Sequence, residues 1–282
     1  MDRLPTALPA HKDPPPRVPQ AHRSLPLGEV HLWSIELSVG EERLARAATC
    51  LSEVERERLE GILDPTRRDR LTLARAALRS IVGAYLGVEA ARVPLYRDPL
   101  GRPRLGERKE TALGERGPRA RESTELAFSL SHSGSLAVVA LARGGAVGVD
   151  IEHLTRRSRE GLLRRALRPA EVEVVLSRPP EEREEAFLKH WTAKEAYGKA
   201  LGVGLAWDPR RVSIDEALDA PAVRDPGDPE AAGRISLRGF SPREGVVGTV
   251  AAGGGGWRLV EPRGESLPAE LEPGWITAPG DS

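Results

Sequence analysis

The chain has 282 residues with 42 basic and 42 acidic side chains, so its formal net charge is zero. This balance argues against a protein that works mainly by coating nucleic acid. The length allows one large or two small domains, and a hydrophobic content of 39%, although low, still allows a sizeable core. The lone cysteine, Cys50, excludes an internal disulfide framework and a multi-cysteine metal site. No apolar run approaches the roughly 18–20 residues that span a bilayer. Prolines interrupt the N-terminus where a signal peptide needs an apolar segment, so we expect a soluble cytoplasmic protein.

The first part of the chain predicts a strand, two helices and a strand hairpin. Alternating apolar residues indicate the strand, and a Ser-x-x-Glu capping pattern opens the short helix. Proline and glycine bound the long helix. The expected segments are a disordered Pro-rich leader at 1–27, a strand at 29–38 with Val30, Leu32 and Ile35 in the core, a helix from Ser52 to Leu59, a helix from Pro65 to Leu86 ended by Gly87, a turn and extended piece at 99–105, a mobile loop at 106–124, and two strands within 126–142 joined by the turn SHSGS.

The second part repeats the order strand, long helix, strand. Its expected segments are a strand at 146–154, a charged helix within 155–177, a helix at 181–201, strands at 234–238, 246–251 and 257–260, and a loose tail. The repetition predicts an α+β fold of two similar halves, each with a small antiparallel sheet and a long helix. We place these halves at 28–135 and 136–262 and the tail at 263–282, with the active site in the cleft between the halves.

Residues 187–202, FLKHWTAKEAYGKALG, form the most unusual predicted helix. Phe187, Trp191, Glu195 and Lys199 fall on one face, which changes from aromatic to acidic to basic. Three of the five lysines of the chain lie in this stretch, although arginine is the usual cation elsewhere. This favours a site that needs a compact ammonium. The same pattern also fits a solvated helix with an ordinary i, i+4 ion pair.

A second pattern places two carboxylates side by side. In the strand VGVDIEH, Asp150 and Glu152 point to the same side, where they repel unless they share a proton or a cation. With Glu195 from a helix packed across this strand, they would offer three oxygen ligands that suit Mg²⁺ or Mn²⁺. Because Mg²⁺ takes phosphate oxygens as further ligands, the pattern predicts a phosphorylated substrate. A strand that simply runs into solvent is the alternative.

The turn SHSGS contains a candidate phosphate ligand, His132. The small neighbours Ser131, Ser133 and Gly134 allow a phosphate to approach closely, although a lone histidine in a turn also fits an ordinary surface residue. The cations that would complete an anion-binding cleft are Arg58, Arg75, Arg102, Lys194 and Lys199.

Taken together, the motifs GVDIE (148–152) and WTAKEAYGKALG (191–202) resemble those of the 4′-phosphopantetheinyl transferases, and the long two-halved chain resembles the Sfp type. GRPRL and FSLSHSG are similar to the Gly-Lys-Pro and Ser-His segments of that family, so the resemblance covers about residues 30–260. It implies a monomer that transfers the 4′-phosphopantetheine group of coenzyme A to a serine of an acyl- or peptidyl-carrier protein and releases 3′,5′-ADP. The expected setting is polyketide, nonribosomal peptide or fatty acid biosynthesis.

The resemblance also assigns roles to single residues. Asp150, Glu152 and Glu195 would hold Mg²⁺ against the pyrophosphate of coenzyme A. From the chemistry of such a transfer, we expect Glu195, directly or through a metal-bound water, to accept the serine proton and Lys199 to stabilise the departing phosphate. Asp150, Glu195 and Lys199 are therefore the catalytic candidates. The remaining contacts to coenzyme A would be Arg58, Arg75 and His132 at the 3′-phosphate, Gly101, Arg102 and Pro103 near the adenine, Lys194 and Lys199 near the phosphates, and Ser131 next to His132.

Two other functions are alternatives to the transferase, and the first of them would use the same acidic residues. A Mg²⁺-dependent phosphohydrolase acting on a nucleotide-like substrate would release inorganic phosphate and need no carrier protein. An Arg-rich nucleic-acid-binding adaptor is disfavoured by the zero net charge and by an aromatic content of 4%, which leaves little for base stacking. We therefore expect neither a nucleic-acid partner nor a membrane partner.

Overall fold

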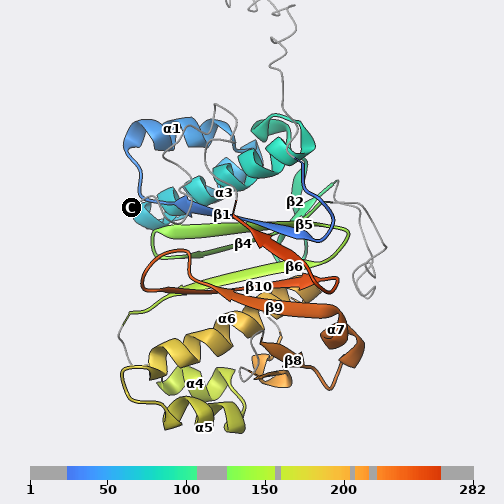
Figure 1. Ribbon diagram of the computed structural model, residues 1–282. Helices are drawn as coiled ribbons and strands as arrows, with labels where there is room; N and C mark the ends of the chain where they lie inside the picture. The colour runs from blue at the N-terminus through green and yellow to red at the C-terminus, as the bar shows by residue number, and fades with distance from the viewer. Residues whose placement is uncertain (1–23, 107–125, 156–159, 204–206, 216–220, 262–282) are drawn as a thin grey trace, which may run out of the picture.

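The computed structural model describes residues 24–106, 126–155, 160–203, 207–215 and 221–261. Helices, a four-stranded sheet, a three-stranded sheet and further helices follow one another as layers (Figure 1). This arrangement confirms the predicted α+β class, with one long helix packed on each sheet. In the described part of the chain, no helix is long and apolar enough to cross a membrane.

The first sheet contains strands from both ends of the chain. Its order is β11-β1-β5-β4, and its strands are β1 (Glu29–Glu36), β4 (Leu126–Ser133), β5 (Leu136–Arg143) and β11 (Arg258–Val260). Strand β11 runs parallel to β1 and the other pairs are antiparallel, so the sheet is mixed rather than purely antiparallel. Because β5 pairs with β1 and β4, the division expected after residue 135 is wrong for the sheets. The chain passes to the second sheet at the Gly144–Gly145 turn.

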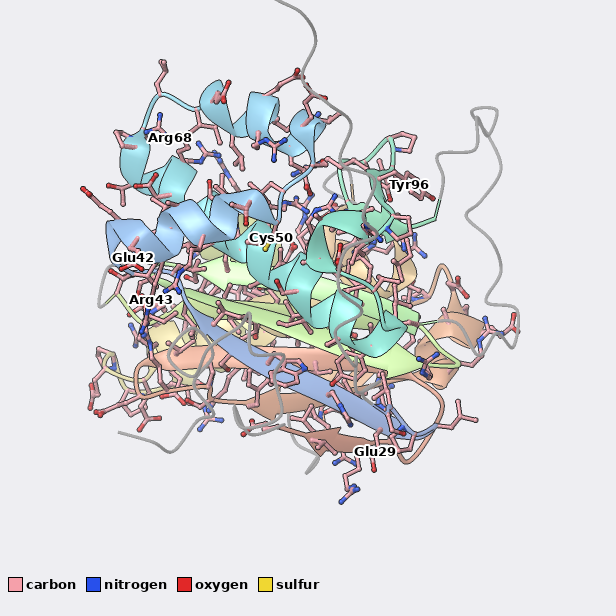
Figure 2. All side chains as sticks on the ribbon, turned by 90° about the horizontal axis from the view of Figure 1, so that it is seen from above. Glu29, Glu42, Arg43, Cys50, Arg68 and Tyr96 are labelled. Atoms are coloured by element: carbon pink, nitrogen blue, oxygen red, sulfur yellow. The ribbon has the colours of Figure 1, made fainter. Side chains whose placement is uncertain are left out.

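Helix α3 (Pro65–Leu86) covers the outer face of the first sheet, and both of its ends form as the sequence predicts. The Asp64 side chain accepts the Arg67 backbone N–H, and Gly87 ends the helix in the left-handed conformation with φ 68°. Helix α2 (Glu53–Glu60) begins at the predicted capping box of Ser52 and Glu55. Helix α1 (Glu41–Thr49), which we did not predict, packs beside α3, with Cys50 among these helices (Figure 2).

The second sheet has the order β6-β10-β9 and is antiparallel throughout. Its strands are β6 (Val147–His153), β9 (Ile235–Phe240) and β10 (Val246–Gly253). Helix α6 (Arg183–Leu201), which ends at Gly202 as predicted, packs against it. A Cβ at Gly148 would lie only 2.0 Å from the Ala196 carbonyl oxygen. A glycine is required there because the backbones of β6 and α6 touch, and this contact sets the helix directly over the strand.

The remaining elements are short. The charged segment expected to form one helix forms α4 (Glu160–Ala166) and α5 (Pro169–Ser177), since Pro169 starts a new helix. The other elements are η1 (Ala90–Arg92), β2 (Leu95–Arg97), β3 (Pro103–Leu105), η2 (Pro209–Arg211), β7 (Ser213–Asp215), β8 (Ala222–Arg224) and α7 (Pro229–Arg234).

The hydrophobic cores fill the spaces between the layers. Val30 and Leu32 lie between the two sheets, whereas Trp33 and Ile35 face α3, so β1 is buried on both faces. The predicted core positions of this strand are confirmed. Leu25 is also buried, so the expected leader ends before residue 27. Residues 1–23, 107–125 and 262–282, which include nearly all of the expected loop and the tail, lie outside the described residues.

Candidate active site

Asp150 lies at the junction of the two sheets and α6, and it is 6% exposed. Its Oδ1 accepts hydrogen bonds from the Lys199 ammonium at 2.7 Å and from the Ser131 hydroxyl at 2.8 Å. Its Oδ2 is buried and accepts no hydrogen bond from the residues that the structure describes. A buried carboxylate oxygen without a partner costs free energy, and a cation beside Oδ2 would remove that cost.

Lys199 reaches from α6 to β6 rather than along its own helix. Its ammonium also donates to the Val149 carbonyl oxygen at 2.9 Å, and its side chain is 24% exposed. The close contact at Gly148 brings the helix near enough for this reach. A solvated helix carrying only an ordinary i, i+4 pair is therefore excluded for Lys199, because its ion pair is with Asp150 of the strand.

The three predicted carboxylates are electrostatic neighbours. Burial raises the pKa of Glu195, and the negative charges of Asp150 and Glu152 raise it further, while Lys199 opposes the shift. Glu152 is half-buried, and its Oε2 accepts a hydrogen bond from the Ser133 hydroxyl at 3.1 Å. Among the described residues, no three His, Cys, Asp or Glu side chains converge closely enough to hold a metal ion as they stand.

A cluster of arginines lies on the first-sheet side of the site. Burial lowers the pKa of Arg75 to about 10, and the positive charges of Arg97 and Arg58 contribute to this shift. Desolvation also lowers the pKa of His132, together with the charges of Lys199, Arg75 and Arg67, even though the imidazole keeps an exposed surface. Crowded cations of this kind are stabilised by an anion. The structure thus brings the predicted Arg58, Arg75 and His132 into one electrostatic neighbourhood.

The predicted Gly101-Arg102-Pro103 segment forms the hairpin between β2 and β3. Gly101 has φ 82°, and the Asp98 carboxylate holds the turn by accepting the backbone N–H of Arg102 at 2.9 Å. The Arg102 guanidinium extends to the C-terminal end of α6, where a Cβ on Gly202 would lie 3.4 Å from its Nη1. That Nη1 is buried and has no hydrogen-bond partner in the described chain.

Two predicted ligand contacts need correction. The side chain of Lys194 is fully buried and pairs with Glu171 of α5 at 2.5 Å, so it does not face the phosphate site. Ser131 is also buried, and its hydroxyl binds Asp150 rather than facing an open surface. Both corrections follow from packing between elements that are distant in the sequence.

A cavity of about 370 Å³ lies among α4, α5 and η2, and its lining includes none of the predicted site residues. Its lining residues are Arg164, Leu167, Pro169, Val172, Glu173, Leu176 and Arg210.

Sequence reasoning missed three residues of this neighbourhood. Arg97 and Arg67 add positive charge around Arg75 and His132, and Asp98 fixes the hairpin that carries Arg102. The arginines had no distinguishing signal, since arginine is abundant throughout the chain. Asp98 had one, because an aspartate before Pro-x-Gly is typical of a turn.

Comparison with known proteins identifies the family of this chain. A family model described as the 4′-phosphopantetheinyl transferase superfamily matches residues 146–244, which include Asp150, Glu152, Glu195 and Lys199. The 4′-phosphopantetheinyl transferase HetI of Nostoc sp. is 37% identical over 231 residues, which are 82% of this chain and 90% of that protein. A putative 4′-phosphopantetheinyl transferase of Synechocystis sp. is 30% identical over 60% of this chain and 63% of its own length.

Among solved structures, the holo-[acyl-carrier-protein] synthase of Neisseria meningitidis matches 39% of this chain and 97% of its own, at 23% identity and a TM-score of 0.33. That score is too low to carry an argument about this chain. The sequence relatives are sufficient: the chain belongs to the 4′-phosphopantetheinyl transferase superfamily. It is an enzyme that transfers the 4′-phosphopantetheine group to carrier proteins, and the comparisons support neither a phosphohydrolase nor a nucleic-acid adaptor.

Proposed function

We propose that the enzyme takes 4′-phosphopantetheine from coenzyme A, attaches it to a serine of an acyl- or peptidyl-carrier protein, and releases 3′,5′-ADP. The observation that supports this most is the environment of Asp150. This buried carboxylate has one oxygen held by Lys199 and Ser131, and its other oxygen has no partner within the described part of the chain. A carboxylate that can bind a cation, next to an ammonium held in place, suits the transfer of a phosphoryl-linked group, because positive charge stabilises the phosphate oxygens.

Mg²⁺ is the proposed cofactor, with Mn²⁺ as a substitute. Asp150 would hold it through Oδ2, and Glu152 and Glu195 would supply the other carboxylates. The raised pKa of Glu195 fits this assignment, because burial and neighbouring negative charges are the conditions that a divalent cation relieves. Held by these carboxylates, the cation would supply positive charge that offsets the negative charge developing during transfer.

The side chains of this chain would move the proton and stabilise the leaving group. Glu195 lies beside Asp150 and Lys199, and it is the carboxylate that would accept the proton of the attacking serine hydroxyl. The Lys199 ammonium lies beside Asp150 and would stabilise the negative charge on the departing 3′,5′-ADP. Transfer then forms one bond from the serine oxygen to phosphorus and breaks the bond to 3′,5′-ADP.

The arginine cluster is the proposed site of the 3′-phosphate. Arg75, Arg58 and His132 would bind this phosphate as the motifs imply, and Arg97 would join them because its positive charge acts on Arg75. Arg102, between Gly101 and Pro103, would lie near the adenine, and its buried unpartnered N–H would gain an acceptor there.

Mass spectrometry of an apo carrier protein incubated with the enzyme, coenzyme A and Mg²⁺ tests the reaction. We expect the carrier to gain the mass of one phosphopantetheine, and EDTA to prevent the gain. Acyl- and peptidyl-carrier proteins should be tried side by side. If no carrier is modified while the enzyme still binds coenzyme A in a filtration assay, the proposed transfer is wrong although the ligand site stands.

We also propose that the enzyme works as a monomer in the cytoplasm. Both sides of the site come from one chain, with Arg75 and His132 on one side and Asp150 and Glu195 on the other. The single Cys50 forms no disulfide and suits a reducing compartment. Light scattering on the purified protein tests the first statement, and cell fractionation tests the second.

A further inference from the structure

Strands β4 and β6 lie side by side without forming a backbone ladder. They belong to different sheets, and the other edge of β6 is paired with β10. The backbone N–H groups of β6 that face β4 therefore need acceptors other than backbone carbonyls, because buried N–H groups are nearly always hydrogen-bonded.

Three serines of β4 supply these acceptors. Ser129, Ser131 and Ser133 alternate along the strand and so share one face. Their hydroxyl oxygens accept the backbone N–H groups of β6 in register: Val149 at 3.1 Å, Ile151 at 3.4 Å and His153 at 3.2 Å. We call Ser129, Ser131 and Ser133 the serine ladder.

The serine ladder also contacts two of the candidate metal ligands. A hydroxyl has a single hydrogen to donate. Ser131 donates it to Asp150 Oδ1 at 2.8 Å, and Ser133 donates it to Glu152 Oε2 at 3.1 Å. Ser129 has the same bond to the β6 backbone but makes no contact with a carboxylate among its hydrogen bonds in the described structure.

Ser131 acts on Asp150 together with Lys199. Both donate to Oδ1, from opposite elements, and this fixes the rotation of the carboxylate. The other oxygen, Oδ2, is then the one presented to a cation. Without the Ser131 hydroxyl, the carboxylate keeps only one of its two hydrogen-bond donors and is free to turn toward Lys199.

We propose that Ser131 and Ser133 are positioning residues that orient the carboxylates of Asp150 and Glu152 toward the metal. This inference rests on the proposed function of those acids. Groups that hold metal ligands in place commonly change metal affinity by about 10–100-fold when removed. Ser131 should lie at the larger end of this range because its partner is the more buried acid.

The test measures the affinity of the enzyme for Mn²⁺ by electron paramagnetic resonance, without coenzyme A or carrier protein. We expect S131A to weaken Mn²⁺ binding at least tenfold and S133A to weaken it less. The matched control is S129A, which removes the same kind of backbone acceptor and touches no carboxylate, and we expect it to bind Mn²⁺ like the wild type. Thermal unfolding of each variant, with EDTA present, checks that it is folded.

The outcomes separate this inference from the proposed function. Equal weakening by S129A and S131A would show that the ladder acts only through the β6 backbone, and unchanged binding by S131A would show that it does not orient Asp150. Either result overturns the inference while the metal site stands. If the wild type binds no Mn²⁺, the proposed metal site fails and the inference with it. If S131A does not fold, S133A carries the test, and unchanged affinity there overturns the inference.

Discussion

The Lys199 ammonium lies 2.7 Å from Asp150 Oδ1, although the two residues are 49 positions apart in the sequence. A contact between helix α6 and strand β6 at Gly148, where a side chain would not fit, brings them together. This pair joins the two motifs that carry the family resemblance. It also makes the two carboxylate oxygens of Asp150 different: Oδ1 has a cationic partner, and Oδ2 has no partner among the described residues.

Replacing Lys199 should abolish most turnover. In K199A the departing phosphate loses its ammonium, and we expect kcat to fall by about 10²–10³-fold, as when one preorganised donor is removed from an active site. The matched control is K189A on the same helix, whose ammonium is exposed and pairs with Glu185 at 2.8 Å. Rates are measured from holo-carrier formation. Equal rates for K199A and K189A would contradict the role given to Lys199.

Glu195 should make the metal-free enzyme less stable as the pH rises. Its pKa is raised in the folded state, so the folded protein binds this proton more tightly than the unfolded chain does. Stability is then lost as the pH increases from the ordinary value of 4.5 through the raised pKa of the folded state. In EDTA at pH 7, E195Q should be more stable than the wild type by about 1 kcal/mol, the scale of relieving one unfavourable site.

Urea unfolding at several pH values measures this difference. It should vanish below the ordinary glutamate pKa, where both side chains are neutral. Adding Mg²⁺ should stabilise the wild type but not E195Q, because only the wild type keeps the full ligand set. A stability difference that does not change with pH would exclude the electrostatic explanation.

His132 should report anion binding. Desolvation and nearby cations hold its pKa below the ordinary value of 6.5, so the imidazole is neutral at pH 7. A phosphate bound beside it favours the charged form, and 3′,5′-ADP should therefore raise this pKa. NMR titration of the imidazole, assigned with an H132N variant, gives the value with and without the nucleotide. An unchanged pKa would place the 3′-phosphate elsewhere.

Arg75 should act on substrate binding more than on turnover. R75A removes a half-buried cation from the proposed 3′-phosphate site, and a charge-assisted hydrogen bond contributes about 1.5–3 kcal/mol. We therefore expect KM for coenzyme A to rise by about 10–100-fold with little change in kcat. The control is R92A, an exposed arginine paired with Glu89. Dephospho-coenzyme A offers a further check, since without a 3′-phosphate it should not distinguish R75A from the wild type.

The buried pair of Lys194 and Glu171 should matter for folding. The Glu171 carboxylate accepts hydrogen bonds from the Lys194 ammonium and from the backbone N–H groups of Arg168 and Ile214. These bonds connect α5 with α6 and β7. E171Q keeps the shape but leaves a buried ammonium without its counter-charge, and we expect a loss of about 3–5 kcal/mol in unfolding free energy. E173Q, an exposed neighbour on α5, is the control. Adding K194M to E171Q should recover part of the loss.

Much of the fold could be predicted because its long elements carry local signals. Asp64, Pro65 and Gly87 bound α3, and Gly202 ends α6, where each residue meets a backbone requirement of a helix end. The missed elements, such as α1 and β7, are short and bury few residues. They form because neighbouring elements pack on them, and no local pattern marks them.

The site residues also separate into those with a local sequence signal and those decided by packing. Asp150, Glu195 and Lys199 were found because their spacing conflicts with ordinary strand and helix patterns. Lys194 was assigned wrongly because it lies in the same motif. It precedes Lys199 by five residues, and on a helix of 3.6 residues per turn the two side chains point in different directions. Only the packing of α5 decides that the direction of Lys194 is the interior.

The sequence by itself determined the family, the long helices and the acids and ammonium of the site, because these depend on residue type and on spacing within one element. The tertiary structure decided which sheet β5 joins, that β4 meets β6 through serine side chains, and that Lys199 rather than Lys194 reaches Asp150. The physical reason is that hydrogen-bond partners and burial depend on how segments distant in the sequence pack together. A residue's own neighbours in the chain do not fix that choice.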